Sequence, residues 1–427
     1  MRKPANIFGT LLLCFACGFF SYGTARLVME PATRSWFNSD FWSEWLRVGE
    51  AMRLTSTYYI EPATVGYEKL GGNAIEGMMD QLDQYSEYLP PAAFNEFQQQ
   101  TDQVYVGIGV TLESLEGFPT IVRVFPGGGA AEASVEPGDR IVEAGGKSTE
   151  GESVDAVVRR LRGEAGTKVS LGIQRPGITP NRTVEIERRK VIMPTVFVKR
   201  MLGDGIGYIK ITQFESRTVS EITSALDELA KQGMKKLVID LRNNPGGLVS
   251  AAVETVGLFC PKGTVVTTAQ GRVSAESLEY KTRVEPLNQD IPIVVIVNRD
   301  SASASEIVSG ALQDLKRAVV VGDRTFGKGV VQSVFTMDST HGLKITSARY
   351  LLPSGRSIQD HGVQPDIYQP VDKRDRSLLG IAEIWRELKR EDEFEKRFHQ
   401  PPPQDVQLIA AVDFMKNLVG LKLSDVK

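Results

Sequence analysis

The chain has 427 residues, enough for two to four domains at roughly 100–200 residues each. Its 50 basic and 53 acidic residues leave a net charge of −3 without a long basic run, which argues against a nucleic-acid-binding protein. The three histidines are far apart in sequence, and the spacings HExxH and CxxC…CxxC are absent, so we expect neither a metal nor a cofactor.

Residues 1–25 are typical of an export signal. Arg2 and Lys3 precede an apolar run, and Gly23-Thr24-Ala25 offers the small residues of a cleavage site. The apolar run is about 14 residues long, shorter than the roughly 20 of a transmembrane helix. A cleaved signal peptide and a retained signal-anchor, tethered to the inner membrane, both fit this segment. Either one predicts export, to a bacterial periplasm.

Cys260 is the only cysteine outside that leader. An exported chain with one thiol forms no intramolecular disulfide, so its stability must come from its hydrophobic cores.

Residues 36–97 predict an N-terminal helical region. Large apolar residues recur there at steps of three and four, and the second helical pattern ends at Pro90-Pro91. Three tryptophans, at positions 36, 42 and 45, fall in its first part. They fit either a packed helical core or a contact with a membrane or a second protomer.

Three further segments follow in chain order. Residues 98–188 read as short strands and glycine turns with one helix between them. From 189 to 370 strands alternate with helices, which predicts an α/β layered domain. Residues 371–427 form a highly charged helical tail, broken by three prolines. The fold class is therefore a multidomain α/β protein.

Ser303 lies where the apolar strand ending at Asn298 meets the next helix. A hydroxyl at such a turn faces free N–H groups and a helix dipole that stabilise developing negative charge. The stretch from Ser303 to Glu306 also fits a capping box, so the serine could be only a helix cap.

Lys328 lies between Gly327 and Gly329, at the mouth of a predicted strand that contains Gln332. In an apolar setting the pKa of a lysine falls, and a neutral lysine can take the proton of a serine hydroxyl. Gln332 could orient that amine. The alternative is a solvated lysine in a glycine turn.

Residues 240–247 (DLRNNPGG) follow a predicted strand. The N–H groups of Gly246 and Gly247 can point into the crevice at the carboxyl end of the sheet, where they could hold an oxyanion. A plain strand-to-helix turn, with Asp240 buried and structural, is the alternative.

These motifs together resemble the carboxyl-terminal processing, or tail-specific, proteases, which are PDZ-containing Ser/Lys endopeptidases. The likeness is carried by SASASE, FGKG and RNNPGG, supported by GIGV, EPGDRI, LRGEAGT and HGVQPD, and covers about residues 40–370. The resemblance implies Ser303 as nucleophile, Lys328 as general base and Gln332 as its partner. It also implies an oxyanion hole formed by Ala304 N–H and the N–H of one of the two glycines, Gly246 or Gly247.

The resemblance also implies that residues 98–188 are a PDZ domain that binds the C-termini of proteins. A peptide would add as a strand and bring its terminal carboxylate to backbone N–H groups. Arg162 corresponds to a position that couples peptide binding to the active site. The residues expected to receive the peptide are Tyr105, Val106, Gly107, Ile108, Gly109 and Val110.

The expected function is an exported serine endopeptidase whose partners are protein substrates with apolar C-termini. A homodimer and an unidentified adaptor are compatible with the sequence. One alternative is a catalytically inert PDZ scaffold; another is a Ser-His-Asp hydrolase using His341 or His361, although no GxSxG elbow is present.

Overall fold

The computed structural model describes residues 38–100, 105–175, 180–191, 194–273, 277–287, 290–387 and 391–417. The expected leader, residues 1–25, and Trp36 lie outside these ranges. The chain divides into two compact units. The first comprises residues 1–95, 271–276 and 332–347, and the second comprises the rest of the chain.

The first unit is mainly helical, as the sequence predicts. Its strand β1 pairs antiparallel with β18, with Glu87 opposite Lys344. Trp42 and Trp45 are 41% and 58% exposed, and α3 has no buried residue. The interpretation of these two tryptophans as a packed core is therefore wrong. The elements are α3 (Ser39–Tyr58), a 3-10 turn (Pro62–Thr64), α4 (Tyr67–Asp80), β1 (Glu87–Leu89) and the start of α5 (Pro91–Gln100), with parts of β17 (Val330–Thr336) and β18 (Gly342–Leu351).

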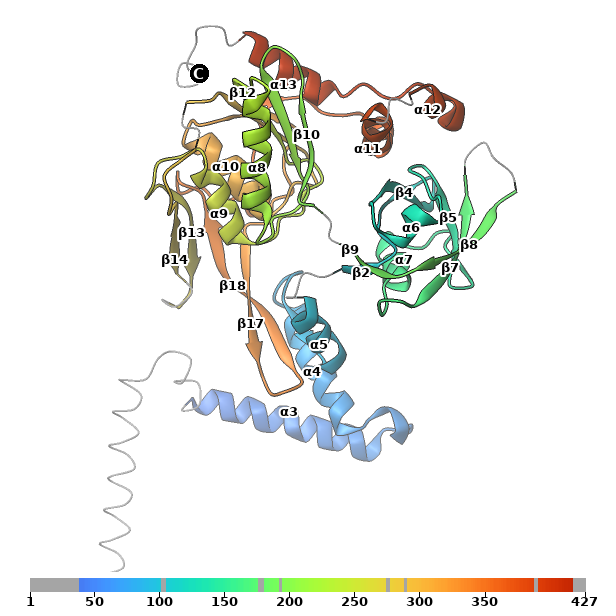
Figure 1. Ribbon diagram of the computed structural model, residues 1–427. Helices are drawn as coiled ribbons and strands as arrows, with labels where there is room; N and C mark the ends of the chain where they lie inside the picture. The colour runs from blue at the N-terminus through green and yellow to red at the C-terminus, as the bar shows by residue number, and fades with distance from the viewer. Residues whose placement is uncertain are drawn as a thin grey trace, which may run out of the picture. The chain divides into compact units, whose positions relative to one another are not determined.

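The second unit begins with the segment expected to be a PDZ domain. Strands β3-β4-β5-β7-β8 form an antiparallel sheet, β2 pairs with β9, and the helices α6 and α7 complete a buried core around Ile121, Leu171 and Ile173 (Figure 1). The elements are β2 (Tyr105–Gly107), β3 (Val110–Leu115), β4 (Phe118–Val124), α6 (Gly129–Glu132), β5 (Arg140–Ala144), β6 (Lys147–Ser148), α7 (Val154–Leu161), β7 (Lys168–Gln174), β8 (Arg182–Glu187) and β9 (Arg189–Val191).

A six-stranded sheet, in the order β10-β11-β12-β15-β16-β19, forms the α/β core of this unit. All of its pairings are parallel except β10 with β11. Its central strands are continuous apolar runs, as expected for a sheet covered on both faces. The strands are β10 (Val196–Met201), β11 (Ile206–Ile211), β12 (Lys236–Asp240), β15 (Ile293–Val297), β16 (Val319–Gly322) and β19 (Ile367–Tyr368).

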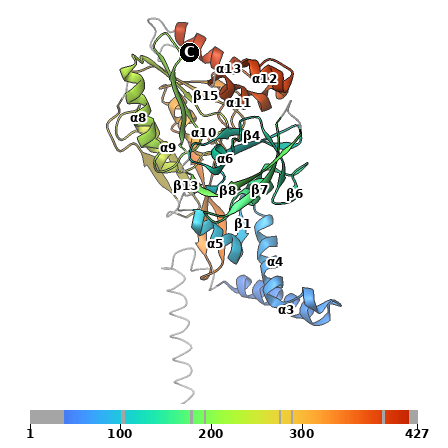
Figure 2. The ribbon, with the colours of Figure 1, turned by 45° about the vertical axis from the view of Figure 1, so that its right-hand side comes forward.

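Helices cover both faces of this sheet. On one face α8 (Thr218–Lys231), α9 (Val249–Gly257) and α10 (Ala304–Asp314) pack in the largest core cluster. On the other face α13 (Val406–Asn417) buries Ala411 and Met415 completely. Figure 2 shows α8 and α9 side by side. The part of the chain expected to be a separate tail therefore supplies one layer of the sandwich.

The hairpin of strands β13 (Val265–Gly271) and β14 (Leu278–Lys281) was not predicted. The helices α11 (Lys373–Glu387) and α12 (Glu391–Phe398) precede α13, in the segment that was predicted to be helical. No helix among the described residues is long and apolar enough to cross a membrane.

Candidate active site

Ser303 is the residue before α10, with φ 54° and ψ −113°. A plain N-cap adopts extended backbone, whereas a non-glycine residue with positive φ is uncommon and strained. The reciprocal bond of a capping box is present, because Ser303 N–H donates to the Glu306 carboxylate over 2.8 Å. The other half of the box is present as well, because the Ser303 side chain accepts from the Glu306 N–H. The turn thus does more than cap a helix, since it holds a half-buried serine in a strained conformation.

Residues 243–247, which we call the glycine loop, pack directly against Ser303. A Cβ on Gly246 would lie 2.8 Å from Ser303 Cβ and 2.9 Å from Ala304 N. Gly246 has φ 107° and Gly247 has φ 134°, both in the region that favours glycine. No side chain therefore fits at Gly246, where the loop meets the start of α10.

The two glycines differ in what their N–H groups do. Gly246 N–H donates to Asn244 Oδ1 over 2.9 Å. Within the described residues the N–H groups of Gly247 and Ala304 have no hydrogen-bond acceptor. Of the two glycines, Gly247 is therefore the one with an uncommitted donor.

Asn244 joins the loop to the serine turn. Its carbonyl accepts from Ala302 N–H at 3.0 Å and from Ser305 Oγ at 2.9 Å, and its side chain donates to Ile211 O at 2.9 Å. The side chain is completely buried. These bonds fix the loop at the carboxyl ends of β11 and β12, where open α/β sheets place their sites.

Glu306 joins the serine turn to the Lys328 segment. Its Oε2 accepts from Ser303 N–H at 2.8 Å and from Lys328 N–H at 2.9 Å. Its Oε1 accepts from Thr325 Oγ1 at 2.6 Å and from Gly327 N–H at 2.7 Å. The backbones of Ser303 and Lys328 therefore share one carboxylate oxygen. Burial raises the pKa of this fully buried carboxyl, and the four hydrogen bonds oppose that rise.

The glycines beside Lys328 allow close contact with a neighbouring segment. A Cβ on Gly329 would lie 2.6 Å from Gln359 N, and one on Gly327 would lie 3.2 Å from the backbone of Asp360. Lys328 itself is half-buried. As expected, it lies against backbone without side-chain bulk, but the strand begins two residues later, at Val330.

The remaining polar candidates lie as follows. Gln332 is on β17, and its Nε2 is 3.5 Å from Thr346 Oγ1. The ring of His341 bonds to Asp338 and Thr340 in the turn after β17. His361 is exposed in a turn.

The expected peptide-binding segment spans β2 and the start of β3. Ile108 is buried in the core, its carbonyl accepts from Ala130 N–H, and Gly109 has φ 80° against Gly128. A Cβ on Gly107 would lie 3.8 Å from Leu161 O at the end of α7. Arg162 is the exposed residue that ends this helix.

Two contacts at this site were missed by the sequence analysis. Glu306 was noted only as half of a capping box, although its carboxylate also binds residues 325–328. Asn244 was read as part of a turn. The pair of asparagines before Pro245 was the available signal, since buried asparagine side chains commonly hold turns. Among the described residues no group of three or more His, Cys, Asp or Glu side chains is placed to hold a metal.

Two protein-family models match this chain. Residues 205–369 match the model of peptidase family S41, and residues 120–175 match the PDZ domain model. The chain is 31% identical to the carboxy-terminal-processing protease of Bartonella bacilliformis over 95% of both chains. It is 35% identical to a probable CtpA-like serine protease of Staphylococcus aureus, of which it spans 62%.

Solved structures show the same relationship. The photosystem II D1 C-terminal processing protease is 29% identical, with a TM-score of 0.51 over 77% of this chain and 93% of that chain. A putative S41 protease from Bacteroides fragilis, 16% identical with a TM-score of 0.52, covers 79% of this chain and 88% of its own and shares the fold.

The fold and these relatives show a serine peptidase that carries a PDZ domain. More specifically, the chain belongs to the carboxy-terminal-processing protease family.

Proposed function

We propose that the protein is an exported endopeptidase that recognises the C-termini of proteins through its PDZ domain and cleaves them with a Ser303–Lys328 dyad. The observation that carries the proposal is that the N–H groups of Ser303 and Lys328 both donate to Oε2 of Glu306. The shared carboxylate brings together the backbones of a candidate nucleophile and a candidate base, as a Ser/Lys dyad requires.

The reaction begins when Ser303 Oγ attacks a substrate carbonyl while Lys328 Nζ takes the hydroxyl proton. The negative charge then develops on the carbonyl oxygen. Ala304 N–H and Gly247 N–H are the donors that could receive it, since neither has an acceptor among the described residues. Gln332 would orient the lysine amine. Lys328 then returns its proton to the leaving amine, and water resolves the acyl-enzyme.

Substrate selection is assigned to the PDZ domain. The segment from Tyr105 to Val110 would bind a terminal carboxylate with its backbone and an apolar last residue beside α7.

We place the protein in the periplasm, because Arg2, Lys3 and the apolar run after them are typical of an export signal. The buried thiol of Cys260 fits an exported protein without disulfides.

The test compares wild type, Ser303→Ala and Lys328→Ala on an unstructured protein with an apolar C-terminus, with fragments followed by mass spectrometry. We expect cleavage by wild type only, with a loss of at least about 1000-fold in each variant, because neither the attack nor the proton transfer survives. A double variant, His341→Ala with His361→Ala, is the control and should keep the wild-type rate.

The same substrate with an amidated C-terminus tests tail recognition. Amidation removes the carboxylate that the PDZ domain would bind, so cleavage should slow about tenfold or more. Equal cleavage by wild type and Ser303→Ala would reduce Ser303 to a helix cap. Equal cleavage of the acid and the amide would remove C-terminal recognition from the proposal.

A further inference from the structure

Arg242 is a buried cation immediately before the glycine loop. It is 7% exposed and follows β12 by two residues. Its Nε donates to both oxygens of Asp240 at 3.0 Å, and its Nη2 lies 2.6 Å from Asp240 Oδ2. The charge of Arg242 outweighs the cost of burial and lowers the pKa of Asp240 to about 2. Asp240 is thus an ionised, fully buried partner of this arginine.

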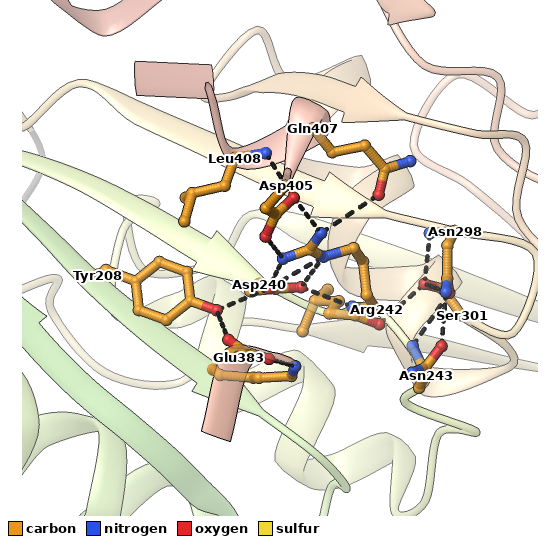
Figure 3. A network of polar contacts seen from close by, with 12 residues as sticks. Tyr208, Asp240, Arg242, Asn243, Asn298, Ser301, Glu383, Asp405, Gln407 and Leu408 are labelled. Carbon is orange, nitrogen blue, oxygen red and sulfur yellow. Dashed lines mark hydrogen bonds and ion pairs between the residues drawn. The ribbon is translucent and has the colours of Figure 1, made fainter. Parts of the chain in front are cut away.

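A second carboxylate reaches Arg242 from the C-terminal part of the chain. Asp405 accepts from Nη1 at 2.7 Å and from Nη2 at 2.8 Å, in a bidentate pair, and Gln407 Oε1 is 3.4 Å from Nη1 (Figure 3). The five N–H donors of the guanidinium are thereby all engaged. Two aspartates and a glutamine therefore fix its plane from both sides.

Asp405 is itself held in place by α13. It precedes this helix, and its Oδ1 accepts from Leu408 N–H at 3.0 Å. The helix buries Ala411 and Met415 against the sheet. The position of the Asp405 carboxylate is consequently set by how α13 packs on the core.

The backbone that follows Arg242 is the glycine loop, residues 243–247, which carries the candidate oxyanion donor Gly247. The next residue, Asn243, donates its N–H to Asn298 Oδ1 at 3.0 Å, and Asn244 binds the serine turn. A rotation of the Arg242 backbone would carry Gly247 away from Ala304, and displacements of about 1 Å cost large factors in rate.

We propose that Asp405 is a positioning residue for catalysis. Through Arg242, Asp405 fixes the loop that carries Gly247, so a single side chain from the C-terminal part of the chain positions the oxyanion donor. The inference rests on the proposed function of that loop.

The test is Asp405→Asn, which keeps the shape of the side chain and removes its charge. Asp413→Asn is the matched control, because Asp413 is an exposed residue of α13. For Asp405→Asn we expect kcat on the unstructured substrate to fall about 10- to 100-fold and KM to stay within about twofold. The control should match wild type in both constants.

Two further readouts separate positioning from general damage. A peptide boronic acid forms a tetrahedral adduct on the serine that needs the oxyanion donors, so its inhibition constant should rise by the same factor as kcat. Affinity for a C-terminal peptide should be unchanged. A kcat within twofold of wild type, or a fall in kcat without weaker boronate binding, would overturn the proposal.

Hydrogen exchange of the amides of residues 242–248 tests the coupling without any substrate. It should be faster in Asp405→Asn than in Asp413→Asn, and equal exchange would overturn the inference. If the loop loosened while wild type cleaved nothing, the proposed function would fail and the coupling would stand. Should Asp405→Asn not fold, Gln407→Met removes the acceptor of one Arg242 N–H, together with the donor to Gln369 O. It should lower kcat several-fold, and an unchanged kcat would count against the proposal.

Discussion

Replacing Glu306 by glutamine is expected to lower kcat by about 100-fold or more, because its carboxylate sets the distance between the serine and lysine backbones. Each oxygen accepts two bonds, one pair from Thr325 and Gly327 and the other from Ser303 and Lys328. An amide would turn its NH₂ group toward one of these pairs of donors. The free energy of unfolding should fall by about 2–4 kcal/mol, since buried donors then lose their acceptor.

Steady-state kinetics and urea unfolding measure both effects. The control is Glu254→Gln, which makes the same chemical change at an exposed position of α9 and should leave both quantities unchanged. Wild-type kcat in Glu306→Gln would show that the shared carboxylate does not position the dyad.

The same variant carries a pH signature. Burial raises the pKa of Glu306 above its ordinary value, so the native state holds that proton more tightly than the unfolded state. The carboxyl's contribution to stability therefore falls as pH rises from about 4.5 through the native pKa. Glutamine has no such dependence. The stability difference between wild type and variant should shrink as pH rises over this interval, and a constant difference would contradict the assignment.

Replacing Gly246 by alanine is expected to reduce kcat/KM at least about 100-fold. The new methyl group would lie 2.8 Å from Ala302 O and from Ser303 Cβ, and 2.9 Å from Ala304 N. The loop and the serine turn must then separate, which displaces both candidate oxyanion donors. The positive φ of 107° adds strain, and together these should cost about 2–4 kcal/mol of unfolding free energy.

Gly263→Ala separates the strain from the clash. Gly263 has φ 86°, and a Cβ there would meet no atom within 4 Å. This variant should lose about 1–2 kcal/mol of stability and keep full activity. Activity of Gly246→Ala within a factor of two of this control would disprove the close fit of the loop against Ser303.

The parts of the site that could be predicted are those encoded locally. The turn at Ser303 follows from an apolar strand that runs into a helical pattern, and the glycines beside Lys328 and in residues 246–247 mark close backbone approach. The layered α/β core could be predicted as well, because the alternation of strands and helices is also a local sequence pattern.

The contacts between these segments were not predictable because they join residues far apart in the chain. Arg242 and Asp405 are 163 positions apart, and nothing in the local pattern around either one identifies the other. The strands β13 and β14 escaped prediction, since pairing rather than propensity decides such strands. The expectation that the tryptophans of α3 form a packed core was wrong, because helical spacing shows which face of a helix is apolar and not what covers that face.

The place of α13 in the sandwich also sets an order of events during synthesis. Val238, Val294, Ile296 and Val321 are completely buried, in the same core cluster as Ala411 and Met415 of this helix. A ribosome makes the strands of the sheet before it makes residues 406–417, so this apolar face of the sheet lacks its covering helix until then. We expect a chain that has not yet gained this helix to be prone to aggregation, because its apolar face is exposed.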